Sequence, residues 1–277
     1  MPAPPSSSAP SPRSLFIVGS PRSGSSLVAG LLADPRYHFG NVVAGNRVMT
    51  GDARNPKGYF ETGLVNRINE AILAPSARRL DGLFKRPFRG QGLIRRLLLP
   101  HVTTWGEHLL YRFPAETTFA PPPLEIVAYM QQVVKPPFCL KDPRFCYTLS
   151  FWQALAPQAG TLCVFRDPYV TARSMLAWPW ALTPKQALQI WTCQYRYALQ
   201  QADDTEDWLF LHYDQALDGS AWDRLAAFSH AALQTDFPER TLKRSKRLDA
   251  SPYPPADALY ADLCERAGYE AGRTQHE

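Results

Sequence analysis

The 277-residue chain has no run close to 18 consecutive apolar residues, the length that a membrane-spanning helix needs. Its start also lacks the apolar segment of a secretory signal peptide, because residues 2–12 are all Pro, Ser or Ala. From these absences we expect a cytoplasmic protein with no membrane span.

Cysteine is scarce, and the five cysteines include no Cys-x-x-Cys pair. The six histidines are dispersed and include no pair at the spacing of zinc ligands. No metal site is therefore expected. An odd number of scattered cysteines in a reducing compartment is typical of free thiols.

The composition, with 45% hydrophobic and 12% aromatic residues, is sufficient for a sizeable core. One α/β domain can reach this length, so we predict a single domain over residues 14–277 after a disordered leader over residues 1–13. The net charge of +5 suits a polyanionic ligand such as a nucleotide. A nucleic-acid surface would also fit this charge, but no DNA- or RNA-binding motif is recognised, so nucleic acid is not the expected partner.

Short apolar runs that read as buried strands alternate with helical patterns along the chain. The strand candidates are residues 15–18, 138–140, 161–165 and 208–212, and the helix candidates are residues 27–32, 169–177, 220–233 and 257–266. This alternation predicts a three-layer α/β fold with a mainly parallel central sheet and helices on both faces. Residues 64–134 do not follow the alternation. We interpret them as a helical insertion that caps the carboxyl edge of the sheet, where ligands bind.

The strongest local signal is Gly-Ser-Pro-Arg-Ser-Gly-Ser-Ser at residues 19–26, between the first strand and a helix. A glycine-containing loop in this place directs several backbone N–H groups into one concavity, which favours phosphate or sulfate. Ser23, Ser25 and Ser26 can add hydroxyl donors. Gly24 lets an anion approach the backbone closely.

A Walker A loop would have Lys and then Ser or Thr after its second glycine. Here Ser25 and Ser26 follow Gly24, and the cation is Arg22, inside the loop. The missing lysine argues against ATP or GTP hydrolysis and against a Mg²⁺ requirement. A P-loop-type nucleotide kinase is kept as an alternative.

The loop resembles the 5′-phosphosulfate loop of sulfotransferases that use 3′-phosphoadenosine 5′-phosphosulfate (PAPS). Its Pro-Arg-Ser-Gly-Ser-Ser form is similar to bacterial and Golgi-type members, which have Arg where cytosolic members have Lys. The resemblance implies a P-loop-like fold, with PAPS as the donor and 3′-phosphoadenosine 5′-phosphate (PAP) as the product. The donor contacts that it implies in this loop are Ser20, Pro21, Arg22, Ser23, Gly24, Ser25 and Ser26.

A second match lies where the strand candidate at residues 161–165 leads into Arg166-Asp167-Pro168. In the family that the loop resembles, an Arg after a strand and a Ser eight positions later bind the 3′-phosphate. Arg166 and Ser174 match both residue types and the spacing. Arg presents a planar fork of donors that suits a phosphate.

Residues 243–247 form a basic run that resembles the late loop with which the family covers the 3′-phosphate. Lys243 and Arg244 are therefore further candidate donor contacts. The alternative interpretation of this run is a solvated charge cluster.

Sulfuryl transfer is an in-line displacement that needs a base for the acceptor and cations for the developing charge. Residues 55–61, Asn-Pro-Lys-Gly-Tyr-Phe-Glu, resemble a stretch of bacterial sulfotransferases in which the Glu is the presumed base. Glu61 is therefore the first candidate base. The alternative bases are His38, His101 and His108.

Two cations are candidates for the chemical step. Arg22 is the natural contact to the phosphosulfate bridge. Lys141 stands in Lys-Asp-Pro-Arg, which resembles a stretch in the same bacterial group, and it could reach the sulfonate or the acceptor oxygen. The structural alternative for Lys141 is an ion pair with a carboxylate.

The sequence leaves the acceptor unidentified, whether a small molecule or a carrier-bound group. Aromatic residues that could line its pocket are Tyr59, Phe60, Trp105, Phe145, Trp178 and Trp180. The basic stretch at residues 78–96 is best read as a solvated helix face, but it could dock an acidic carrier protein or a polyanionic saccharide. We expect a hydroxyl-directed sulfotransferase, and the alternative is a non-catalytic nucleotide-binding module of the same fold.

Overall fold

The computed structural model describes residues 11–52, 55–80, 109–178, 180, 182–202, 207–239, 241 and 246–270. Its centre is a four-stranded sheet in the order β2-β1-β3-β4, and each pair of neighbouring strands is parallel. The strands are β1 (Leu15–Val18), β2 (Cys139–Lys141), β3 (Gly160–Phe165) and β4 (Trp208–His212). The predicted parallel sheet is confirmed, and each predicted strand end lies within one residue of the observed one.

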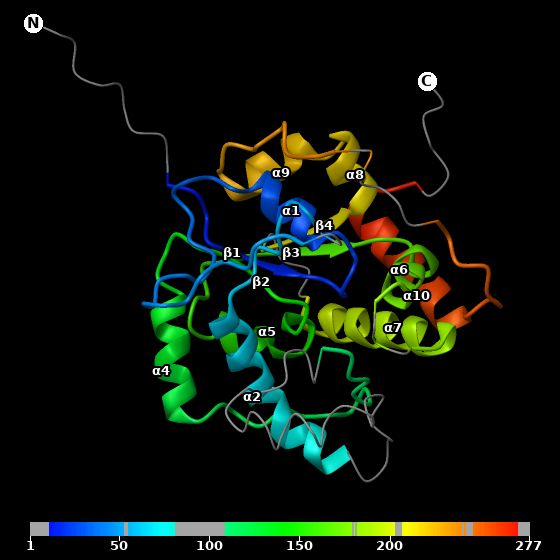
Figure 1. The fold of residues 1–277 in the computed structure, drawn as a ribbon, viewed down its shortest axis with the longest axis horizontal. Coiled ribbons are helices and arrows are strands. Elements are labelled where there is room, and N and C mark those ends of the chain that lie inside the picture. Colours follow the sequence, from blue (N-terminus) through cyan, green and yellow to red (C-terminus); the bar gives the residue numbers. More distant parts are fainter. Residues whose placement is uncertain are drawn as a thin grey trace, which may run out of the picture.

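Helices cover both faces of the sheet, so the predicted three-layer α/β fold is also confirmed (Figure 1). One face carries α1 (Ser25–Leu31), α8 (Tyr213–Asp218) and α9 (Trp222–Ser229). The other carries α2 (Gly63–Leu80), α4 (Leu124–Val133), α5 (Phe145–Gln153) and α7 (Pro184–Gln201). Beside α7 pack α6 (Pro168–Leu176) and α10 (Pro254–Ala267).

Side chains of β1 alternate between two apolar cores. Phe16 and Val18 face the core under α2, α4 and α5, whereas Leu15 and Ile17 face the core under α1, α8 and α9. Because helices bury both faces, the strand is apolar throughout rather than alternating, which is the pattern that made it recognisable.

Helix caps explain several polar residues near the sheet edge. The side chain of Asp167 caps α6 by accepting hydrogen bonds from the backbone N–H groups of Tyr169 and Val170, and Pro168 occupies the first turn. Thr183 and Gln186 form a capping box that starts α7. The Asp-Pro that follows Arg166 therefore has a structural role, which is to start α6 and fix its position beside β3.

The predicted helical insertion at residues 64–134 contains α2 and α4, which pack together on the α5 side of the sheet. Residues 81–108, the middle of this segment, lie outside the described residues, and its role as a cap stays a prediction. At the start of the chain, Arg13 of the expected leader donates its N–H to Ser229 O at 2.8 Å and lies over the Phe228 ring. The packed chain thus begins before residue 14.

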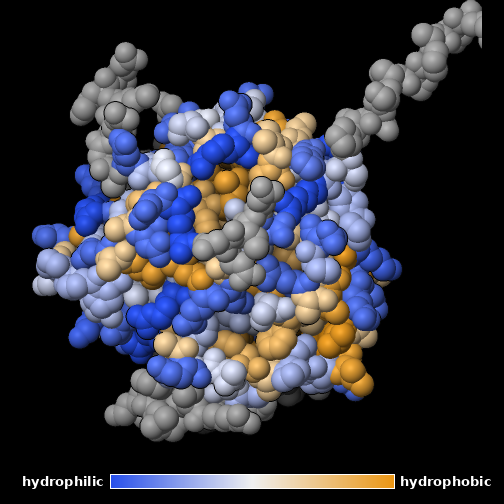
Figure 2. All heavy atoms as spheres, turned by 180° about the vertical axis from the view of Figure 1, so that it is seen from behind, coloured by the Kyte–Doolittle hydropathy of each residue, from blue (hydrophilic) through white to orange (hydrophobic). Residues whose placement is uncertain are grey.

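On the face drawn in Figure 2, hydrophilic side chains are mixed with apolar ones. Leu124, at the start of α4, is 84% exposed. Among the helices that the structure describes, none has the length and hydropathy to cross a membrane.

Gly30 of α1 packs closely against the side chain of Phe237. A Cβ at Gly30 would lie 2.0 Å from Cε1 of Phe237. We expect Gly30→Ala to displace the Phe237 ring and to lower the free energy of unfolding by about 1–3 kcal/mol. The better helix propensity of Ala offsets only about 0.5–1 kcal/mol of this. Urea denaturation measures the change, and unaltered stability would mean that the ring moves aside without cost.

Candidate active site

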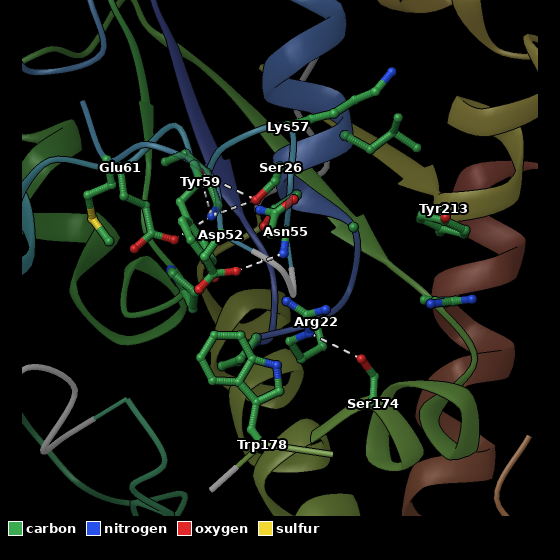
Figure 3. A pocket seen from close by; sticks show the side chains of 18 of the residues that line it. Arg22, Ser26, Asp52, Asn55, Lys57, Tyr59, Glu61, Ser174, Trp178 and Tyr213 are labelled. Atoms are coloured by element: carbon green, nitrogen blue, oxygen red, sulfur yellow. Dashed lines mark hydrogen bonds and ion pairs between the residues drawn. The ribbon is translucent and has the colours of Figure 1, made fainter. Parts of the chain in front are cut away.

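The site lies at the carboxyl edge of the sheet. The chain passes from β1 to β2 on one side and from β3 to β4 on the other, so the ends of β1 and β3 flank a topological switch point, where open α/β sheets bind ligands. A pocket of about 680 Å³ opens here, lined by residues that follow each of the four strands. Figure 3 shows Glu61 and Tyr213 at opposite sides of this pocket, with Arg22 between them.

The loop after β1 reaches the pocket with Pro21, Arg22, Gly24, Ser25 and Ser26. All five are predicted donor contacts. The other two predicted contacts of this loop, Ser20 and Ser23, have fully buried side chains and do not line the pocket.

Backbone conformation and packing fix the shape of this loop. Arg22 and Gly24 have positive φ angles of 70° and 99°. At Gly24 a Cβ would lie 2.3 Å from Cδ2 of Tyr213, so only glycine fits against that ring. The Tyr195 hydroxyl accepts a hydrogen bond from the backbone N–H of Ser20 at 3.1 Å and donates one to Val164 O at 2.6 Å, which ties the loop to α7 and β3.

Two guanidinium groups converge on the pocket from the two predicted anchors. Arg22 Nε donates to the Ser174 hydroxyl at 3.1 Å, and its guanidinium lies 5.2 Å from the Trp178 ring centre. Arg166 is 7% exposed and lies 4.2 Å from the ring centre of Tyr213. The structure thus brings Arg22 together with Arg166 and Ser174, although the two segments lie about 140 residues apart in the sequence.

Neither guanidinium forms an ion pair with a carboxylate among the described residues, and the buried Nη2 of Arg166 has no hydrogen-bond partner there. Burial lowers the pKa of both groups, and the proximity of Arg166 lowers that of Arg22 further. Uncompensated charge away from water is costly, so the buried Arg166 and the partly buried Arg22 in one pocket favour an anionic ligand.

The candidate base and the candidate lysine contact each other. Lys141 Nζ forms an ion pair with Glu61 Oε1, and it donates to Ser26 Oγ at 3.2 Å and to Tyr59 O at 3.0 Å. The side chains of Glu61 and Lys141 are 12% and 3% exposed. All three N–H groups of the ammonium are therefore used, and they link the loop after β1 to Glu61.

The stretch at residues 55–61 folds so that Tyr59 and Glu61 both line the pocket. Phe60 between them has a φ of 54° and turns its ring away, against Phe39 and Phe237. The Tyr59 hydroxyl donates to Asp52 Oδ2 at 2.8 Å. Because the Phe60 ring packs in the interior, an apolar residue can stand between two residues that line the pocket.

A buried ion-pair network places Lys141. Arg144 Nη1 donates to both oxygens of Asp142, at 2.9 and 3.0 Å, and its Nε donates to Glu70 Oε1. Burial raises the pKa of Asp142, and the charge of Arg144 opposes that rise. The network joins the end of β2 to α2. The sequence analysis did not predict that Glu70 takes part in it.

The other predicted side chains are placed differently. His38 is hydrogen-bonded to Lys135 O and lies beside Phe138, before the start of β2, and it does not line the pocket. It is therefore not the base, because the site is at the opposite end of that strand. Tyr59, Trp178 and Trp180 line the pocket, whereas Phe60 and Phe145 pack in the cores. The predicted His101, His108, Trp105, Lys243 and Arg244 lie outside the described residues.

Sequence reasoning missed several pocket residues, of which Tyr213 and Asn66 matter most. Tyr213 directly follows β4, and this place after a strand is the signal that could have identified it. Asn66 lies in the first turn of α2 and donates its Nδ2–H to Glu61 Oε2 at 3.2 Å. Nothing in the sequence indicates this contact.

The comparisons with known proteins agree with this architecture. A model of the sulfotransferase family matches residues 12–219, so the chain belongs to the sulfotransferase family and is a transferase. A comparison with curated protein sequences found no match.

Among solved structures, the sulfotransferase domain from the Synechococcus PCC 7002 olefin synthase is similar, with a TM-score of 0.51 and 18% identity over 91% of this chain and 94% of that one. Sulfotransferase STF9 from Mycobacterium avium has a TM-score of 0.48 and 16% identity over 95% of this chain and 78% of that one. The sulfotransferase domain from the curacin biosynthetic pathway has a TM-score of 0.45 and 14% identity over 94% of this chain and 98% of that one. At this identity, the olefin synthase domain supports the fold alone.

Proposed function

We propose that this sulfotransferase takes its sulfuryl group from PAPS and transfers it to a hydroxyl group, releasing PAP. The observation that carries the proposal is the pair of guanidinium groups of Arg22, which is partly buried, and Arg166, which is buried; both lack carboxylate partners among the described residues and share a pocket with Glu61. PAPS has anionic groups at both ends of its ribose, and two separate cations suit such a ligand.

In this proposal Arg166 and Ser174 hold the 3′-phosphate. Arg22, with Ser25 and Ser26, holds the 5′-phosphosulfate. Arg22 lies between Ser174 and the side of the pocket that carries Glu61 (Figure 3). The sulfonate would therefore point toward Glu61, and Tyr213 would lie at the far end.

The chemical step is an in-line displacement at sulfur. The acceptor oxygen forms a bond to sulfur while the bond from sulfur to the phosphate oxygen breaks, and the electron pair stays on PAP. Glu61 takes the proton of the acceptor hydroxyl. Arg22 stabilises the charge on the leaving phosphate, and Lys141 lies beside the oxygens that gain charge.

Calorimetric titration with PAP, ADP and ATP in the absence of Mg²⁺ tests the donor assignment. We expect PAP to bind at least tenfold more tightly than ADP, because ADP carries both of its phosphates at the 5′ position and only PAP has a 3′-phosphate for Arg166. Preference for ATP would favour a P-loop-type kinase. Tight PAP binding without sulfation of any hydroxyl would favour a non-catalytic nucleotide-binding module.

A further inference from the structure

Asn66 is a buried amide in the wall of the pocket and contacts the candidate base, Glu61. It lies in the first turn of α2 and is 6% exposed. Its Nδ2 donates to Glu61 Oε2 at 3.2 Å, and the sulfur of Met49 lies 4.0 Å from the same nitrogen. Asn66, Met49 and Glu61 all line the pocket.

The orientation of this amide follows from the chemistry of its neighbour. An ionised carboxylate only accepts hydrogen bonds, so the nitrogen of Asn66 has to face Glu61. The carbonyl oxygen, Oδ1, then points away from Glu61. Among the described residues Oδ1 is buried and has no hydrogen-bond donor.

Native interiors rarely leave a buried carbonyl oxygen unpaired, and a ligand that brings a donor is one explanation for such an exception. The side chain beside the amide is Met49, an unbranched thioether that changes conformation easily. A ligand that displaces Met49 would reach Asn66 from the pocket. Nothing of this kind is needed to explain donor binding, because the guanidinium groups lie elsewhere in the pocket.

We infer that Asn66 Oδ1 binds the acceptor, and that the acceptor carries a second hydrogen-bond donor close to the hydroxyl that is sulfated. The inference rests on the proposed function, in which Glu61 takes the proton of that hydroxyl. Glu61 Oε2 and Asn66 Oδ1 are bridged by a single amide nitrogen. Donors that reach both oxygens at about 2.7–3.0 Å have to sit on adjacent carbons or one carbon further apart. Vicinal diols and amino alcohols meet this requirement, and simple monohydric alcohols and phenols do not.

Matched acceptor pairs test the inference, with PAPS as the donor. Catechol is compared with its monomethyl ether guaiacol, and cis-cyclohexane-1,2-diol with cyclohexanol; the planar pair suits the aromatic wall of Tyr59, Trp178 and Trp180. In each pair only the first compound has the second donor. We expect kcat/KM to favour the diol by about ten- to a hundredfold, because a monohydric analogue leaves the buried carbonyl unpaired.

Asn66→Leu removes the carbonyl, and the preference for the diol within each pair should then fall to near unity while PAP affinity is unchanged. Asn66→Asp keeps oxygen acceptors at this position, so it should retain the preference even if kcat falls. Equal kcat/KM within the pairs, turnover of none of the four acceptors, or a preference that survives Asn66→Leu would overturn the inference. PAP affinity, measured on the same samples, shows separately whether the proposed donor site has failed.

Discussion

Glu61→Gln should lower the kcat of sulfuryl transfer about a hundred- to ten-thousandfold, the range that a positioned general base contributes. The carboxamide has nearly the same size as the carboxylate, but it does not accept a proton. Glu61 lies on the far side of the pocket from Tyr213 (Figure 3), and Arg166 lies over the Tyr213 ring, so the PAP dissociation constant should be unchanged. Single-turnover kinetics with PAPS and calorimetry with PAP measure the two quantities on one preparation.

The substitution also breaks an ion pair, because Lys141 then faces a neutral amide. Glu239→Gln is the matched control, since Glu239 also lines the pocket and also pairs with a lysine, Lys57, at 3.3 Å. We expect Glu239→Gln to leave kcat near that of the native chain. Equal losses in both variants would indicate a general effect of charge in the pocket. Full activity of Glu61→Gln would remove Glu61 from the mechanism.

The sheet and its edge could be predicted from the sequence because their signals are local. A strand buried on both faces is a short apolar run, and β1 and β4 were predicted with their observed bounds. The carboxyl ends of parallel strands meet at one edge of the sheet. Charged and polar residues that directly follow the strands are therefore brought together at this edge. Arg166 and Lys141, which were proposed because their motifs resemble those of the family, lie at the ends of strands in this way, and so does Tyr213.

Contacts between distant segments could not be predicted in the same way. Lys141 and Glu61 were proposed independently, but their ion pair joins residues 80 positions apart and depends on how residues 59–61 lie beside the end of β2. The amide of Asn66 reaches Glu61 across a turn in which Phe60 has a positive φ and α2 starts at Gly63. No sequence pattern specifies either feature.

Helices α5, α7 and α8 were not among the predicted helices, and α7 was missed although its signal is local. Helix α7 starts with Thr183-Pro184 and with Gln186 three residues after the cap, which is a capping box in sequence as well as in structure. Its helical pattern was obscured by its buried polar residues, since Thr192 and Gln194 both lie in the interior. Gln194 Nε2 donates to Leu109 O at 2.8 Å, so a tertiary contact pairs the amide nitrogen of a residue that looks exposed in the sequence.

Arg166→Met should weaken PAP binding about thirty- to a thousandfold, and should weaken binding of AMP, which has no 3′-phosphate, far less. Removing one partner of a buried, hydrogen-bonded charge pair costs about 2–4 kcal/mol, and each 1.4 kcal/mol is tenfold in affinity. Methionine keeps an unbranched stem against the Tyr213 ring, so the packing that shapes the loop at Gly24 is retained. Calorimetry with both nucleotides gives the two ratios.

Arg173→Met is the matched control for this variant, because Arg173 is an exposed residue of α6 that does not line the pocket. It should leave both affinities unchanged. Equal weakening of PAP and AMP by Arg166→Met would contradict the assignment of Arg166 to the 3′-phosphate. It would mean either that Arg166 binds the 5′-phosphate, which both nucleotides carry, or that it supports Tyr213 and the loop without binding a phosphate.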